Sequence, residues 1–522
     1  MKIGAAFLAA SSLALQSACA TPPTRTVDVL IRGGTIYPGK GEPFIGDVGI
    51  TGDRIVFAGP SRGTSAARTI DATGMVVAPG FIDPHTHMGA DLASDDRETR
   101  LIPAFLMQGV TTAFIGNDGG GDLEVGQVLG RAKEKPVGVN YAAYIGLGAV
   151  RRQVVGDDDR PPNEAELREM RSLVAGAMCE GALGLSTGMF YAPQSFATTD
   201  EVIALAHEAG VRGGIYDSHI RDESSYTVGL AGAIDEALEI GRKAGIPVHI
   251  SHIKALGVDV QGQGGAIIAK VEAAHATGQK VTADQYPWSA SGTSLVASLV
   301  PSWAQDGGRA AMLGRFDTPA LRERLHSDMR ENLRKRGGAE SLLITEGEFG
   351  GHRLSQVADA HGMDPIDAAI AVIRKADPAV ASFNQSEADI AAFMRRPWVM
   401  TSSDASTGHP RVYGSFARKY AKYVIEDEVL ELSDFIARST TLTADTFGLA
   451  DRGRIADGAF ADIVVFDPGA YAARATYEQP TLTASGVRAV LVNGVIAVDR
   501  GALTGAAAGR ALPHTFTAGT CS

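Results

Sequence analysis

The chain is predicted to fold as an α/β protein whose main part is a closed (β/α)8 barrel of the TIM type. Three observations predict it: strands and helices alternate over residues 81–446, the 62 glycines suit many tight turns, and strand-rich segments flank this alternation at both ends. A doubly wound open sheet is the alternative, but no G-x-G-x-x-G motif opens a helix in this chain of 522 residues.

The two ends of the chain are predicted to meet in one small β domain. Residues 24–80 contain short strands such as "VDVLIRGG", and residues 447–508 contain similar ones such as "VRAVLVNGVIAV". Each is rich in β-branched residues and is bounded by glycine-containing turns. The middle of the chain therefore forms a separate unit between them.

Within residues 81–446, strands such as "GVTTAFIGND", "GGIYDSHI" and "IPVHISHI" alternate with helices. Asn163 and Glu166 form the capping box of one helix, and Thr198 and Glu201 predict a second box. The polar, helix-like segment at about 301–340 interrupts the alternation and is predicted to be an insertion.

The N-terminus predicts export. Residues 1–20 carry one lysine, an apolar run from Ile3 to Leu15 and small residues before a cleavage position after Ala20, as in a secretory signal peptide. "LQSAC" also resembles a lipoprotein box, with Cys19 as the lipidated residue, although Gln16 departs from that pattern. We expect a periplasmic protein, with a lipid anchor at Cys19 as an open alternative.

The composition excludes several classes of partner and structure. The net charge of −12 and the absence of a basic stripe argue against nucleic acid. The only cysteines are Cys19, Cys179 and Cys521, so we expect no disulfide framework and assign Cys179 to the core of a helix. No uncharged run beyond the N-terminus is long enough to span a bilayer.

Potential metal ligands follow several of the predicted strands. His85 and His87 in "GFIDPHTH" share one face of an extended segment, which suits a transition metal. Because the active site of such a barrel lies at the C-terminal ends of its strands, residues there should converge. The strand-end candidates are His85, His87, Asp118, His219, His252 and Asp404.

Several motifs make the chain resemble the amidohydrolase superfamily, and within it the D-aminoacylase branch: "PGFIDPHTH", "GALGLSTGMFY", "SHIRDE", "ISHIKA", "TADQYPW", "FNQSEADI", "SSDAS" and "HPRVYGSF". The resemblance implies a metal-dependent hydrolase built on a (β/α)8 barrel with a flanking β-sandwich. It also implies that His219 and His252 hold the tight zinc, that His85 and His87 hold a second metal position, and that Asp404 is the catalytic aspartate.

The chain departs from this branch at Asp118, which stands in "GNDG" where D-aminoacylases typically show "GNCG". No lysine occurs between Lys135 and Lys243, so the carboxylated lysine of other branches has no counterpart here. Asp118 is the remaining anionic ligand, and a carboxylate is harder than a thiolate. Two bridged zinc ions, one zinc ion, or a site that accepts manganese all remain open.

The resemblance implies hydrolysis of an N-acyl-D-amino acid, with Lys254, Tyr286 and Arg411 receiving the substrate carboxylate and Tyr191 polarising the scissile carbonyl. Acidic-substrate relatives carry a basic residue beyond the "YP" strand, and residues 288–303 contain none, which favours neutral or apolar side chains. Alternatives are an exported dipeptidase or carboxypeptidase, a cyclic amidase, and a non-catalytic periplasmic binding protein. In each case we expect a small-molecule ligand.

Overall fold

The computed structural model describes residue 1, residues 25–61 and residues 63–521. Apart from residue 1, the predicted signal peptide lies outside these residues, and so does Cys19. Among the helices of the described residues, none combines the length and the hydrophobicity needed to cross a membrane.

The central unit is the predicted barrel. All neighbouring strands in it run parallel, in two groups of the order β6-β7-β8 and β9-β10-β11-β12-β13-β17. Backbone bonds join the groups on both sides, from Leu183 N to Ala143 O (2.8 Å) and from Asp404 N to His85 O (3.0 Å). The barrel strands are β6 (Phe81–Asp83), β7 (Val110–Ile115), β8 (Asn140–Ala143), continued by β9 (Ile145–Gly146), β10 (Gly184–Gly188), β11 (Ile215–His219), β12 (Val248–Ile250), β13 (Val281–Gln285) and β17 (Val399–Thr401).

Helices connect the barrel strands and pack their apolar faces on them, as alternating strands and amphipathic helices require. The connecting helices are α1 (Gly89–Ala93), α2 (Arg97–Arg100), α3 (Pro103–Leu106), α4 (Val125–Glu134), α5 (Leu147–Val154), α6 (Glu164–Cys179), η1 (Gln194–Phe196), α7 (Thr199–Gly210), α8 (Gly229–Ala244), α9 (Gly264–Ala276) and α16 (Glu387–Met394). After β17 follow α17 (Arg411–Arg418), the π-helix η3 (Lys419–Glu426), α18 (Leu432–Ser439) and α19 (Thr441–Thr446).

The two predicted capping boxes differ. Asn163 and Glu166 form the complete box at the start of α6, as expected. The Thr198 hydroxyl accepts from the Glu201 backbone N–H at α7, but the Glu201 carboxylate instead receives the buried guanidinium of Arg151 at 2.7 Å. A buried ion pair with another helix therefore replaces the second half of that box.

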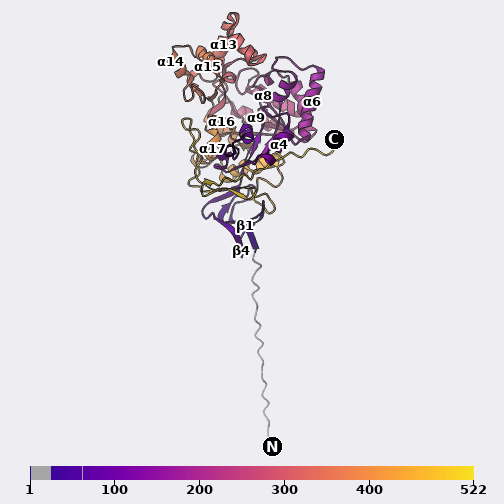
Figure 1. The fold of residues 1–522 in the computed structure, drawn as a ribbon, viewed down its shortest axis with the longest axis vertical. Coiled ribbons are helices and arrows are strands. Elements are labelled where there is room, and N and C mark those ends of the chain that lie inside the picture. The colour runs from indigo at the N-terminus through magenta and orange to yellow at the C-terminus, as the bar shows by residue number, and fades with distance from the viewer. Residues whose placement is uncertain (2–24, 62, 522) are drawn as a thin grey trace.

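The insertion is longer than residues 301–340. It begins with β14 (Ala290–Ser294) and ends with β16 (Ala379–Phe383), which pair antiparallel with each other and with β15 (Leu342–Ile344). It has an apolar core of its own, and its helices α13, α14 and α15 stand at one end of the molecule (Figure 1). Its helices are α10 (Leu295–Leu299), α11 (Ser302–Gln305), α12 (Gly308–Phe316), α13 (Pro319–Lys335), η2 (Ala339–Ser341), α14 (Leu354–His361) and α15 (Pro365–Lys375).

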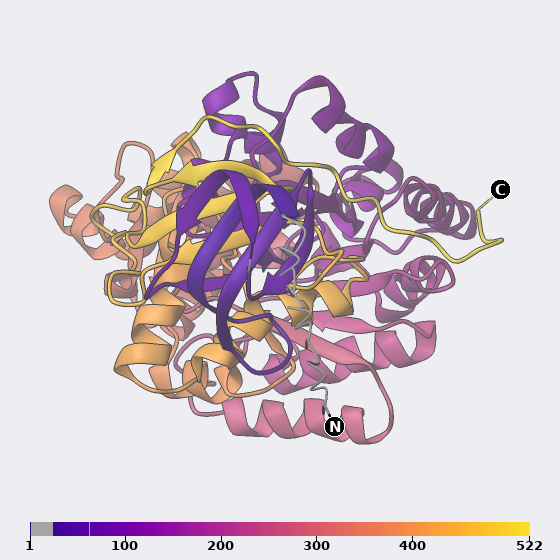
Figure 2. The same cartoon turned by 90° about the horizontal axis from the view of Figure 1, so that it is seen from below.

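Strands from both ends of the chain form one sheet at the opposite end of the molecule. Figure 2 shows the indigo N-terminal and yellow C-terminal strands side by side across the barrel. The link between them is β5, which pairs with β1 and with β18. The strands are β1 (Arg25–Ile36), β2 (Phe44–Thr51), β3 (Arg54–Gly59), β4 (Thr64–Asp71), β5 (Val76–Pro79), β18 (Ile463–Phe466), β19 (Val487–Val492), β20 (Val495–Asp499) and β21 (Ala502–Leu503).

A disulfide corrects the expectation for the cysteines. Cys179, at the end of α6, is bonded to Cys521 and is half-buried instead of lying in the core. Between β21 and this bond, the C-terminal segment crosses the barrel helices (Figure 2), with backbone bonds from Leu512 N to Tyr141 O and from His514 N to Gly181 O. The pairing could not be expected from spacing, because 342 residues separate the two cysteines.

Candidate metal centre and active site

Six predicted ligands meet at the C-terminal ends of the barrel strands. His85 and His87 follow β6, Asp118 follows β7, His219 ends β11, His252 follows β12 and Asp404 follows β17. Asp118, His252 and Asp404 have positive φ angles of 55°, 36° and 49°. Three non-glycine residues held in this sparsely populated region at one place are typical of a functional site.

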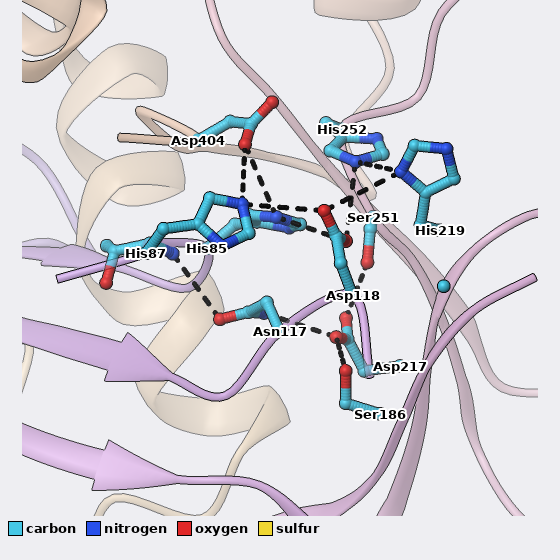
Figure 3. A network of polar contacts seen from close by, with 12 residues as sticks. His85, His87, Asn117, Asp118, Ser186, Asp217, His219, Ser251, His252 and Asp404 are labelled. Carbon is cyan, nitrogen blue, oxygen red and sulfur yellow. Dashed lines mark hydrogen bonds and ion pairs between the residues drawn. The ribbon is translucent and has the colours of Figure 1, made fainter. Parts of the chain in front are cut away.

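The six side chains form two clusters whose potential ligand atoms lie within 4.8 Å of one another (Figure 3). One cluster contains His85, His87, Asp118 and Asp404. The other contains Asp118, His219 and His252. Asp118 is therefore common to both clusters.

The Asp118 carboxylate lies between the two histidine pairs. Its Oδ1 is 3.4 Å from Nε2 of His85 and 3.5 Å from Nε2 of His252. Its Oδ2 is 3.4 Å from Nε2 of His87 and 3.6 Å from Nδ1 of His219. Because each oxygen faces one imidazole of each pair, the carboxylate is placed as a bridging ligand.

Unpartnered buried atoms show that this donor set fits a divalent cation. Both ring nitrogens of His85 and Oδ1 of Asp118 are buried without a hydrogen-bond partner among the described residues. Buried polar groups are rarely left in that state, since it costs about 1–3 kcal/mol per group. Four imidazoles with carboxylates form a nitrogen and oxygen donor set, which suits zinc and also manganese.

The electrostatics keep both aspartates anionic. Burial opposes ionisation of Asp118, but the His85 and His252 imidazoles hold its pKa well below the ordinary value. Burial likewise opposes ionisation of Asp404, and the Arg411 guanidinium together with neighbouring imidazoles lowers its pKa. At neutral pH both side chains are therefore available as a ligand or a proton acceptor.

Arg411 contacts Asp404 directly. Its Nη1 donates to Oδ2 of Asp404 at 2.6 Å, and its Nη2 donates to Oγ of Ser406 at 2.6 Å. On the other side of the carboxylate, Nε2 of His87 is 3.1 Å from Oδ1. The guanidinium lines the cavity, and its bond to Oδ2 also orients the Asp404 carboxylate.

Lys254 is already partnered. Its ammonium donates to Oε1 of Glu223 at 2.5 Å and to the His252 carbonyl at 3.0 Å, and it lies 2.7 Å from Nδ1 of His252. The ammonium is therefore held by Glu223 and by the backbone of His252. Glu223 was not identified from the sequence, although it stands four residues after His219 in "SHIRDE".

The two predicted tyrosines occupy different places. Tyr191 lines the cavity, with its ring 4.8 Å from that of His219 and its hydroxyl 3.4 Å from Thr293 Oγ1. Tyr286 is buried and is absent from the cavity lining; its hydroxyl accepts from Gln385 Nε2 at 2.9 Å. Its ring instead lies beneath the cations of Lys254 and Arg411.

Two buried aspartates beneath the candidate metal ligands were also not identified from the sequence. Asp217 accepts from Ser251 Oγ at 2.9 Å and from Asn117 Nδ2 and Ser186 Oγ at 3.2 Å (Figure 3). Asp284 lies 3.6 Å from Nδ1 of His85 and 2.9 Å from Nε2 of His249. His249 contacts Thr282 and Asp284 and belongs to neither ligand cluster.

A cavity of about 440 Å³ opens over the candidate metal ligands. Its wall includes His87, Asp118, His219, His252 and Asp404, and residues of the insertion close it on another side. The space suits a small molecule whose reacting bond lies next to the ligands.

Comparison with known proteins agrees with this arrangement. The model of the amidohydrolase family Amidohydro_3 matches residues 68–498. The D-aminoacylase of Alcaligenes xylosoxydans xylosoxydans is 34% identical over 521 residues, covering 94% of this chain and 98% of that protein.

Two solved structures are similar to this chain over almost its whole length. One, from work on the binuclear metal centre of D-aminoacylase with one-metal activation and second-metal attenuation, has a TM-score of 0.80 at 30% identity. The other is the N-acyl-D-glutamate deacylase of Bordetella bronchiseptica with zinc and a phosphonate inhibitor, with a TM-score of 0.81 at 29% identity. Each covers 94% of this chain and 100% of its own. The chain therefore belongs to the amidohydrolase family, in its D-aminoacylase branch, and is a hydrolase that acts on amide bonds.

Proposed function

We propose that the protein is a zinc-dependent deacylase that hydrolyses N-acyl-D-amino acids to a carboxylate and a D-amino acid. The observation that carries this proposal is the Asp118 carboxylate between two histidine pairs, beside the Asp404 carboxylate at the cavity. The D-aminoacylase and the N-acyl-D-glutamate deacylase with similar chains support the substrate class.

Each of the two ligand clusters would hold one metal ion. His219, His252 and Asp118 would hold the tight zinc, and His85, His87 and Asp118 would hold a second ion. When bound, zinc supplies hydroxide at neutral pH and polarises an amide carbonyl. The binuclear centre named for the D-aminoacylase structure supports two positions, and the ligand types also admit manganese.

The protein's own residues would move the proton and orient the amide. Asp404 accepts a proton from the attacking water and returns it to the leaving nitrogen, because an amine departs poorly unless it is protonated. Burial raises the pKa of Tyr191, so its phenol stays neutral and can donate to the carbonyl oxygen. Arg411 keeps Asp404 oriented and can share its guanidinium with the substrate carboxylate.

The direct test is a substrate screen on zinc-loaded full-length protein. N-acetyl-D- and N-acetyl-L-amino acids and L-dipeptides are compared by the release of free amine. Turnover confined to the N-acetyl-D-amino acids supports the proposal, and turnover confined to L-dipeptides would replace it with a dipeptidase.

We also propose that the protein is exported to the periplasm. The signal-like residues 1–20 and the bond between Cys179 and Cys521 support this, since disulfides persist in oxidising compartments. Cell fractionation of the native producer, with the protein found in the cytosolic fraction, would contradict it.

A further inference from the structure

The insertion brings a cation into the cavity wall. Helix α13 ends at Lys335, whose carbonyl accepts from Val258 N at 3.0 Å and whose ammonium donates to Ser225 O at 2.8 Å. Arg334 adds a two-bond ion pair with Asp259. The end of the helix is thus fixed on the loops that follow β11 and β12, and the next residue, Arg336, lines the cavity.

Arg336 is buried but lacks an anionic partner. It is 2% exposed; its Nε donates to Ser298 O at 3.1 Å, while its Nη1 is buried without a hydrogen-bond partner in the part of the chain that the structure describes. None of the described carboxylates forms an ion pair with it within 4.0 Å, whereas Arg411 in the same cavity is paired with Asp404. A buried guanidinium with a free donor is placed to receive an anion.

A second unpartnered donor lies beside it. The hydroxyl of Tyr226 is buried without a partner among the described residues, and its ring is 5.8 Å from the Arg336 guanidinium carbon. The Tyr226 ring is 5.4 Å from that of Phe190, which in turn stacks on the metal-ligand candidate His219 at 5.9 Å. The two donors therefore lie one aromatic ring away from the proposed reacting centre.

The remaining charges in the wall direct an anion to the same place. Glu346 and Asp377 also line the cavity, but each accepts a backbone N–H, from Ala379 and Val296 respectively. Their negative charge disfavours an anion on that side. Residues 288–303 contain no lysine or arginine, but Arg336 reaches the cavity from outside that segment.

We propose that Arg336 and Tyr226 form a subsite for a second carboxylate of the substrate, carried by the amino-acid side chain or by the acyl group. This inference rests on the proposed deacylase function and names its substrate class. The enzyme would then prefer dianionic N-acyl-D-amino acids over uncharged analogues of the same shape.

The test uses two pairs of substrates that differ by one charge. N-acetyl-D-glutamate is compared with N-acetyl-D-glutamine, and N-succinyl-D-leucine with its succinamide analogue, on zinc-loaded full-length enzyme. In one pair, kcat/KM of the charged member should be about 10- to 100-fold higher than that of its uncharged analogue, because a hydrogen bond to a charged group typically contributes that much. The pair that shows the preference identifies which part of the substrate carries the carboxylate.

Substitutions at Arg336 and Tyr226 test whether this preference arises from the subsite. Arg336→Gln should reduce the charged-to-neutral ratio to about 1, Arg336→Lys should restore part of it, and Tyr226→Phe should lower it about tenfold or less. Arg330→Gln, on the same helix with a side chain 60% exposed, should keep the wild-type ratio. The absence of a preference in both pairs, or a preference that survives Arg336→Gln, overturns the proposal.

Binding measurements test the subsite independently of turnover. If none of the four substrates is hydrolysed, the proposed function fails, and calorimetric titration with the same two pairs of compounds then decides the subsite. Tighter binding of the charged member of one pair by the wild type than by Tyr226→Phe or Arg336→Gln supports the subsite, and equal binding in both pairs rejects it.

Discussion

Oδ1 of Asp118 lies 3.5 Å from Nε2 of His252, and the other oxygen of the same carboxylate faces the ring of His87. Replacing Asp118 by Asn removes the anion common to both clusters. We expect zinc affinity to fall more than about 100-fold, beyond what loss of a residue that merely hydrogen-bonds a ligand costs.

Zinc content and competition with a chromophoric chelator measure this change. Asp118→Cys is the matched variant, because a thiolate also ligates zinc and this residue type stands there in the resembled branch. It should retain one tight zinc. Equal zinc affinity of the wild type and the Asn variant would show that Asp118 is not a ligand.

Asp404→Asn should keep the tight metal and lose turnover. The cluster of Asp118, His219 and His252 does not include Asp404, so its ion should remain. Loss of the proton carrier should lower kcat about 10²- to 10⁴-fold. Zinc analysis and steady-state kinetics on one preparation check both parts, and near wild-type kcat would remove Asp404 from the mechanism.

Glu223→Gln should weaken zinc binding through the histidines. The Glu223 carboxylate is 3.1 Å from Nδ1 of His252 and 3.7 Å from Nε2 of His219, on the ring sides away from Asp118. Carboxylates that orient metal-bound histidines typically contribute about 10- to 100-fold in affinity. Glu236 pairs with Arg221 outside the cavity. Glu236→Gln is therefore the control and should bind zinc with wild-type affinity.

Zinc affinity should decrease as the pH falls. Burial and the Lys254 ammonium oppose protonation of His252, but Asp118 and Glu223 raise its pKa to about 9 before metal binds. Because a ligand imidazole must be neutral, protons compete with zinc below that pH. The apparent Kd should rise at least about tenfold per pH unit between pH 8 and pH 6; an unchanged Kd would contradict this.

Loss of the disulfide should affect stability and leave catalysis intact. Cys179 ends the helix before β10, at the end of the barrel opposite the cavity. Cys179→Ser should lower the free energy of unfolding by about 2–4 kcal/mol while kcat/KM stays the same. Thermal unfolding measures it, and Cys521→Ser should give the same shift if the bond itself is responsible.

The candidate metal ligands could be predicted to converge because each ends or follows a strand, and barrel geometry brings strand ends together. The sequence could not identify Asp217 or Asp284, whose side chains point into the barrel from the strands themselves and resemble other core positions. Glu223 and Arg336 were missed for a different reason. Their positions at the cavity depend on which loop and which helix end meet above the barrel, and no local sequence pattern determines that contact.

The terminal sheet has a consequence for how the chain matures. Strand β5 lies between β1 and β18, so β5 lacks one of its two neighbours until residues 463–466 of β18 have been synthesised. A nascent N-terminal part cannot close this sheet on its own. The sheet that unites both ends of the chain is therefore completed only after the entire barrel has been synthesised.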